Sequence, residues 1–294
     1  MSESKFKIEV LDTSKSKTPQ RQAAKKDIMP KFPFSMMISG RSGSGKTNAM
    51  LNILTRKELY GNFFHTILVF SPTAGSYDDT YKALKIPEEN FVREFTGELL
   101  EDIIEARKKL IDEQGVEKVA KTSRVCLILD DIIAERSFLE SPMALRLFSL
   151  LRHYLCSIVV LVQSYTKLPR ALRVNCNAVI IFPSLQSERE ILIKEITPSG
   201  IRMRDFEKVI DYCTEGQYDF LYINNHAPPG KRIRKNLDEI VDLNKFKREN
   251  ISANITNKDE QVNKRTLEVD RERREIDPSQ GGGIKEPGRS RTAR

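Results

Sequence analysis

A glycine-rich stretch that ends in lysine and threonine has the clearest chemical signature in this sequence. Residues 40–47 read Gly-Arg-Ser-Gly-Ser-Gly-Lys-Thr, the G-x-x-x-x-G-K-T pattern of a Walker A phosphate loop. The glycines let the backbone turn so that successive N–H groups point inward and cradle an anion at the start of a helix. We expect Lys46 to reach the β- and γ-phosphates of a nucleotide and the Thr47 hydroxyl to bind Mg²⁺. The residues expected to bind the nucleotide are Gly40, Arg41, Ser42, Gly43, Ser44, Gly45, Lys46 and Thr47.

Two adjacent acids after an apolar run form a second candidate. Residues 124–131 read Arg-Val-Cys-Leu-Ile-Leu-Asp-Asp, which is typical of a buried parallel strand that ends in acid. Taken alone, the pattern also fits a strand that ends in a solvated acidic turn. Downstream of a phosphate loop it favours a Walker B site, because ligands of open α/β sheets bind at the carboxyl ends of strands. We expect Asp130 to hold Mg²⁺, through water, and Asp131 to act as the base or to orient water.

The apolar run at 157–162 is followed by an amide side chain, Gln163. At the tip of a strand beside the two acids, an amide is placed to touch a γ-phosphate or the water that attacks it. The alternative is a strand-terminal glutamine exposed to solvent.

A phosphate loop needs a strand before it and a helix after it, and both are predicted. Residues 34–39 form an apolar run of strand length, and residues 46–55 carry apolar side chains at helical spacing. This context argues against a chance Gly/Ser-rich turn. Alternating strands and helices predict a parallel sheet that is covered on both faces. Further strands are expected at 66–70, 178–182, 217–225 and 231–235, helices at 78–84, 98–113, 142–154, 167–174 and 185–213, and a polar connection at 114–123.

Charge and composition outline the domains. The chain has 294 residues and a net charge of +8, of which residues 1–34 and 243–294 contribute +4 each, so the part between them is neutral. We predict a flexible N-terminal arm at 1–33, one domain at 34–242 and a basic, disordered tail at 243–294. Basic tails either meet an acidic partner such as nucleic acid or are simply solvated.

Several classes of protein are not indicated. No apolar run approaches the ~20 residues of a membrane span, and the charged N-terminal stretch lacks the apolar core of a secretory signal, so we expect no membrane segment and no secretion. The four cysteines form no Cys-x-x-Cys pair, and the histidines have no metal-ligand spacing. Reduced thiols and no structural zinc are therefore expected.

Five segments together resemble a known family. They are GRSGSGKT at 40–47, ILVFSPTAGSYDD at 67–79, CLILDD at 126–131, RHYLCSIVVLVQS at 152–164 and YDFLYIN at 218–224. Their order is similar to that of the additional-strand P-loop NTPases, which are RecA-like α/β proteins with a central, mostly parallel sheet flanked by helices. Within this group the chain resembles the FtsK–HerA superfamily of DNA translocases, and in particular the poxvirus-type genome packaging ATPases of large DNA viruses, virophages and related elements.

The resemblance implies a function and its partners. It implies an ATP-driven motor, with ATP and Mg²⁺ as cofactors, that moves viral double-stranded DNA into a preformed capsid. It further implies a homo-oligomeric ring, contacts to DNA that do not read sequence, capsid proteins as partners, and a place in the virion or the viral factory rather than at a membrane. The alternatives are a P-loop nucleoside or nucleotide kinase and a nucleic-acid-binding protein that does not hydrolyse nucleotide.

The resemblance also assigns roles to particular residues. Gln163 resembles the family's sensor, and Arg152 resembles an arginine offered to the nucleotide of the neighbouring subunit. We expect Arg152 to lie at the rim of the carboxyl edge of the sheet, with Arg146 on the same helix as its competitor; both also fit ordinary surface arginines. One departure concerns Asp131, since many members have glutamate there. The shorter side chain requires the attacking water to sit closer or to be oriented by another group.

Overall fold

The computed structural model describes residues 28–72, 79–94, 96–131 and 139–247. The chain divides into two units, Met1–Leu243 and Asn244–Arg294. Of the second unit only residues 244–247, which are helical, are described. Everything below concerns the first unit.

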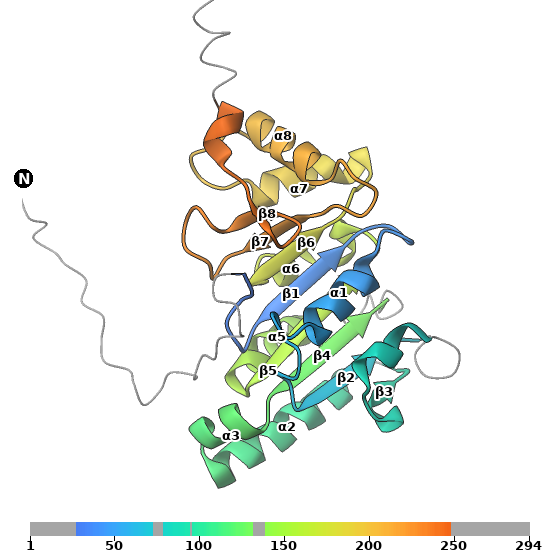
Figure 1. The fold of residues 1–294 in the computed structure, drawn as a ribbon. Helices are drawn as coiled ribbons and strands as arrows, with labels where there is room; N and C mark the ends of the chain where they lie inside the picture. The colour runs from blue at the N-terminus through green and yellow to red at the C-terminus, as the bar shows by residue number, and fades with distance from the viewer. Residues whose placement is uncertain (1–27, 73–78, 95, 132–138, 248–294) are drawn as a thin grey trace, which may run out of the picture. The chain divides into compact units, whose positions relative to one another are not determined.

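Across the described residues, nine strands form one sheet in the order β3-β2-β4-β5-β1-β6-β7-β8-β9 (Figure 1). All neighbours from β3 to β6 are parallel, and β7, β8 and β9 continue the sheet in antiparallel pairs. This confirms the mostly parallel α/β sheet. The strand β5 lies between β1 and β4, so it separates the strand before the phosphate loop from the strand before the acids. The strands are β1 (Ser35–Ser39), β2 (Thr66–Phe70), β3 (Phe91–Val92), β4 (Val125–Asp130), β5 (Cys156–Val162), β6 (Ala178–Ile181), β7 (Leu221–Asn224), β8 (Ile233–Lys235) and β9 (Glu239–Ile240).

The helices begin and end at residues whose types favour those positions. Thr96 caps α2 by accepting a hydrogen bond from the Leu99 N–H at 3.2 Å, and Gly115 ends it at φ +80°. Ser141 caps α5 in the same way, with proline in the first turn. The helices are α1 (Lys46–Thr55), α2 (Gly97–Gln114), α3 (Val116–Thr122), α5 (Pro142–His153), α6 (Arg170–Arg173), α7 (Gln186–Ile196) and α8 (Met203–Cys213), with 3-10 turns η1 (Asp79–Leu84), η2 (Glu88–Asn90) and η4 (Tyr165–Lys167).

The polar connection expected at 114–123 is wrong, because α3 occupies most of it. Val119 and Ala120 of α3 are buried in a small cluster with Phe32 and Leu155. Apolar residues spaced for a single helical turn are too few to stand out in a sequence, and burial by distant residues stabilises the helix. The helical segment at 167–174 is also shorter than expected, and the one at 185–213 divides into α7 and α8.

Each face of the sheet has its own apolar layer, since side chains alternate along a strand. On one face α1 packs over the central strands (Figure 1). On the other face α5 packs against β5 and α6 packs against α5, and Leu151 and Leu172 of these helices line one cavity with Ile158 and Val160 of β5. The α1 face of the strands includes Met36, Ile38, Cys126, Ile128, Val159, Leu161, Ala178 and Ile180.

Residues 28–33 pack against the sheet, although the sequence assigned them to the arm. Met29 and Phe32 are buried, and the Tyr222 hydroxyl donates a hydrogen bond to the Ile28 carbonyl at 2.6 Å. The domain therefore includes these residues. The arm at 1–27 and the tail at 248–294 lie outside the described residues and stay predictions.

All four cysteines are buried and unpaired. Within the described part of the chain, no helix combines the length and the apolar character that crossing a bilayer requires.

Candidate nucleotide-binding site

The register of the sheet brings the predicted site residues to one edge. Ser39, the last residue of β1, pairs with Val162, the last residue of β5, and Asp130 of β4 pairs with Leu161. The three strands therefore end almost level. As a result, the phosphate loop, the two acids and Gln163 all begin at the carboxyl edge, where ligands of open α/β sheets bind.

The phosphate loop has the backbone shape that its glycines permit. Gly43 and Gly45 have φ values of +74° and +97°, in the left-handed region that side chains disfavour. The Gly45 carbonyl accepts the Ala49 N–H at 2.8 Å and so starts α1. Gly40 is required for a different reason, because a Cβ there would lie 2.6 Å from the Phe182 Cβ. The loop thus wraps the N-terminus of a helix, which is a site for anions.

A cavity of about 380 Å³ at this edge brings the predicted chemical groups together. Lys46, Thr47, Asp130, Asp131 and Gln163 all line it. Its remaining lining residues are Ser42, Gly43, Gly45, Asn48 and Leu161.

The other loop residues do not line this cavity but shape the loop. The Gly40 N–H donates to the Val162 carbonyl at 3.1 Å, and the Arg41 carbonyl accepts the Ser44 N–H at 3.1 Å. The Ser44 hydroxyl is buried without a hydrogen-bond partner among the described residues.

Lys46 lies half-buried over the loop. Its Nζ donates a hydrogen bond to the Arg41 carbonyl at 2.9 Å. Partial burial lowers the pKa of Lys46 below its ordinary value, while the negative charges of Asp130 and Asp131 act in the opposite direction. The ammonium group therefore lies against a carbonyl of the loop and close enough to both carboxylates to be stabilised by their charge.

The two adjacent acids have different partners. The Gln163 Nε2 donates a hydrogen bond to the Asp131 Oδ1 at 3.0 Å. Asp131 has a φ of +54°, a conformation that is uncommon outside glycine and is often found at functional sites. Asp130 is half-buried instead, and its Oδ2 accepts a hydrogen bond from the Tyr81 hydroxyl. The structure thus divides the acids into an exposed one near Gln163 and a recessed one held by a tyrosine.

Tyr81 is a site residue that sequence reasoning missed. It lies in η1, its side chain is 2% exposed, and its ring meets Phe91 edge to face. Tyr81 is separated from Asp130 by 49 residues, and nothing in the local pattern distinguishes it from an ordinary core tyrosine.

The oxygen atoms around the cavity suit a magnesium ion. The Thr47 hydroxyl and the Asp130 carboxylate both line it, and Mg²⁺ is commonly held by one or two protein oxygens together with water and phosphate oxygens. The described residues contain no cluster of three or more His, Cys, Asp or Glu that could hold a metal without a nucleotide.

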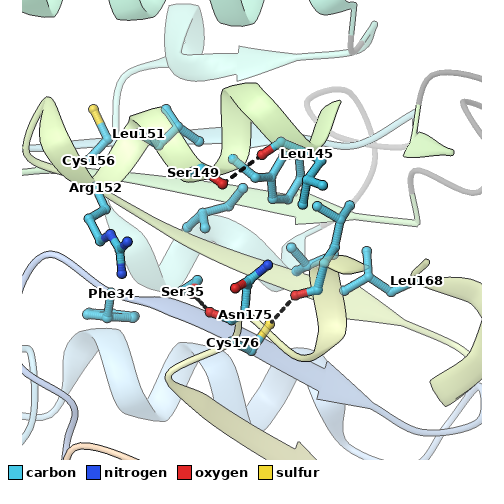
Figure 2. Close-up of a pocket in the computed structure, with 14 residues that line it drawn as sticks. Phe34, Ser35, Leu145, Ser149, Leu151, Arg152, Cys156, Leu168, Asn175 and Cys176 are labelled. Carbon is cyan, nitrogen blue, oxygen red and sulfur yellow. Dashed lines mark hydrogen bonds between the residues drawn. The ribbon is translucent and has the colours of Figure 1, made fainter. Parts of the chain in front are cut away.

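The expectation that Arg152 lies at the carboxyl rim is wrong. Arg152 is in the last turn of α5, just before β5 begins, and it lines a cavity of only about 50 Å³ beside Phe34 and Ser35 at the start of β1. Figure 2 shows its side chain directed towards Phe34. A helix that connects two parallel strands runs back along the sheet, so it ends at the amino edge. Along β5, this edge is about 20 Å from the phosphate loop.

The pKa of His226 gives a second indication of where Arg152 lies. Burial, and then the charges of Lys31 and Arg152, lower the pKa of His226. Arg152 therefore does not join the cavity of its own chain, and its action on a neighbouring subunit stays a prediction. Arg146, on the same helix, is exposed.

Comparison with known proteins gives three kinds of match. The family described as Poxvirus A32 protein matches residues 21–264. Among curated relatives, Uncharacterized protein 075L of Invertebrate iridescent virus 6 is 25% identical over 197 residues, which is 65% of this chain and 70% of that protein. DNA packaging protein OPG160 of Vaccinia virus (strain Copenhagen) is 27% identical over 186 residues, 62% of this chain and 65% of that protein.

The Monkeypox virus protein of the same name is also 27% identical, and the match covers 58% of its length. The chain thus spans less than two thirds of these two poxvirus relatives. Among solved structures, the genome packaging NTPase B204 from Sulfolobus turreted icosahedral virus 2, in complex with ATP-gammaS, is 16% identical with a TM-score of 0.47. That match covers 71% of this chain and 98% of B204.

Proposed function

Because this chain belongs to the Poxvirus A32 protein family, we propose that it is a Mg²⁺-dependent ATPase that drives viral double-stranded DNA into a preformed capsid. The observation that carries the proposal is the cavity at the carboxyl edge. It combines a phosphate loop with Lys46, two acids and the Gln163 amide, the groups that ATP hydrolysis requires. The names of the poxvirus relatives, DNA packaging proteins, supply the process that hydrolysis would drive.

In the proposed reaction the chain's own residues position charge and water. Lys46 would leave the Arg41 carbonyl and bind the β- and γ-phosphates. Thr47 and Asp130 would hold Mg²⁺, which supplies positive charge next to the phosphates when bound. Asp131 would orient the attacking water and accept its proton, and Gln163 would fix the Asp131 carboxylate through their hydrogen bond.

The proposed partners are double-stranded DNA, further copies of this chain and capsid proteins. A pump must grip phosphates without reading bases, so DNA binding should be strong at low salt and independent of sequence. The amino-edge position of Arg152 is compatible with a homo-oligomeric ring in which it reaches the nucleotide of the next subunit. Capsid proteins would be further partners, and the virion or the viral factory would be the place of action.

The proposal is tested by measuring release of inorganic phosphate from ATP with and without double-stranded DNA. We expect hydrolysis that requires Mg²⁺, rises with DNA of any sequence, and loses this stimulation as salt is added. The matched control is Lys46→Ala, which reports contaminating ATPases. A wild-type rate equal to that of Lys46→Ala would refute the ATPase. A wild-type rate that exceeds this control but does not change when DNA is added would support ATP hydrolysis and refute DNA translocation.

A further inference from the structure

A second cavity lies on the far side of the phosphate loop from the acids. It measures about 730 Å³ and shares Gly45 and Asn48 with the first cavity. In the sheet, β5 and β4 lie on one side of β1, and β6 and β7 lie on the other. We name the second cavity the α1 groove; its lining includes Asn48, Ala49 and Asn52 of α1, Phe182 after β6, Tyr218 and Phe220 before β7, and Asn236, Leu237 and Asp238 after β8.

An exposed aromatic ring stands where the groove meets the loop. Tyr218 is 60% exposed, although it is a large aromatic residue in a well-packed domain. A Cβ built on Gly45 would lie 3.4 Å from the Tyr218 Cδ1, so the ring touches the last glycine of the loop. Behind it Phe182 is buried, with its ring 5.2 Å from that of Phe220. The groove therefore has an aromatic wall that begins at the loop.

The segment that carries Tyr218 is fixed in place. The Phe220 N–H donates to the Asn236 Oδ1 at 3.1 Å, and the Asn236 N–H donates to the Phe220 carbonyl at 2.9 Å. The Asn236 amide also donates to the Asp219 carboxylate at 2.9 Å. Because the backbone next to the ring is already held by these hydrogen bonds, stacking of a planar ligand on Tyr218 costs little conformational entropy.

The direction of a bound nucleotide follows from the two ends of the loop. The terminal phosphate must face Asp131 and Gln163, because these groups would act on the attacking water. The helix N-terminus at Asn48 then holds the other end of the phosphate chain. Whatever is attached there enters the α1 groove, since Asn48 lines both cavities.

We propose that the α1 groove binds the nucleoside half of the nucleotide and that Tyr218 stacks on its base. This inference rests on the proposed function, since it presumes that the phosphate loop binds a nucleotide. A groove of this volume falls within the range of ligand sites, and base stacking on an aromatic ring needs only the flat face of each partner.

The contacts within the groove also bear on which bases it accepts. The Asn52 amide donates to the Asn48 carbonyl and accepts from the Arg56 Nε at 2.9 Å, and Asn236 is engaged as described above. Both amide side chains thus already hold hydrogen bonds within the protein, so stacking on Tyr218, rather than hydrogen bonds from these two amides to the base edge, provides the affinity. Adenine and guanine nucleotides should therefore bind within several-fold of each other, because every base has a flat π-face.

The sequence contains no tryptophan, which makes a direct test possible. In Tyr218→Trp the new indole is the sole tryptophan, and stacking on a base should quench its fluorescence. We expect quenching by Mg·ATP and by Mg·GTP but none by inorganic tripolyphosphate, which has no base. The matched control is Val174→Trp, at a residue that is 54% exposed and follows α6, away from the loop; its fluorescence should not respond.

Affinities complete the test. Tyr218→Ala should bind ATP on the order of tenfold more weakly and tripolyphosphate unchanged, whereas Tyr218→Phe should keep both affinities, because it keeps the ring. Unchanged ATP binding in Tyr218→Ala would overturn the inference, and so would an equal loss of ATP and tripolyphosphate, which would assign Tyr218 to the shape of the loop. Wild-type protein that binds tripolyphosphate but not ATP would also overturn it. Wild-type protein that binds neither would instead contradict the proposed function.

Discussion

The two edges of the central sheet are built for different purposes. At the carboxyl edge the strands end level, and the cavity of about 380 Å³ opens beside the phosphate loop. At the amino edge Phe32 and Leu155 are fully buried, and the cavity beside Arg152 measures only about 50 Å³. One edge therefore leaves room for a ligand, and the other is filled by side chains.

This difference bears on the role of Arg152. A guanidinium group about 20 Å from the phosphate loop cannot stabilise charge on a phosphate bound in the same chain. If Arg152 takes part in catalysis, it must reach the nucleotide of another subunit. The comparison of edges thus leaves two roles, one in a neighbouring subunit and one as a surface arginine, and the predictions below separate them.

The largest effects are expected for Lys46→Ala and Arg152→Ala. Lys46→Ala should abolish turnover, because among the described residues no other positive side chain lines the phosphate cavity.

Arg152→Ala should bind ATP normally, and its ATPase rate should fall roughly 10³–10⁵-fold if Arg152 acts on a neighbouring subunit. The two variants, each inactive alone, should regain part of the ATPase rate when mixed, because some interfaces then pair an intact loop with an intact arginine.

Arg146→Ala is the matched control for this experiment, since Arg146 is an exposed arginine of the same helix. It should keep wild-type activity by itself. If Arg146→Ala alone were inactive and regained activity on mixing with Lys46→Ala, Arg146 would be the arginine that acts on the neighbouring subunit. Full activity of Arg152→Ala would identify Arg152 as a surface arginine.

A smaller loss is expected for Asp131→Asn, which tests whether the two acids differ as their partners suggest. The amide cannot accept the proton of water, so the turnover rate should fall about 10²–10⁴-fold while Mg·ATP still binds.

Asp130→Asn should instead raise the Mg²⁺ concentration needed for half-maximal rate. Steady-state rates over a Mg²⁺ titration, together with ATP affinity, distinguish the two. The same defect in both variants would argue against separate roles.

The smallest effect is expected for Tyr81→Phe, which keeps the ring against Phe91 but removes the hydroxyl that donates to Asp130. Loss of this hydrogen bond should leave the Asp130 carboxylate less well oriented, so the Mg²⁺ requirement should rise by several-fold. The maximal rate at saturating Mg²⁺ and the Tm should change little. An unchanged Mg²⁺ titration would show that Tyr81 serves only the core.

Much of the fold can be predicted because its causes are local. The apolar runs predicted at 34–39, 66–70 and 157–162 form strands that differ from these bounds by at most one residue, and the spacing of apolar residues after Gly45 forms α1 with its predicted bounds. The glycine positions of the loop and the acids after an apolar run are also local features. Parallel strands bring their carboxyl ends to one edge, so the meeting of Lys46, Asp131 and Gln163 could be expected without a structure.

Contacts between distant segments could not be predicted in this way. The direction of α5, which decides the edge at which Arg152 lies, depends on how a crossover returns to the sheet. α3 depends on burial against Phe32, and Tyr81 and Tyr218 reach Asp130 and Gly45 only through packing. The groups that line the phosphate end of the site can be read from the chain alone, because backbone conformation and side-chain alternation are set by neighbouring residues. What surrounds those groups depends on how the whole sheet and its helices pack, so it is visible only in the folded molecule.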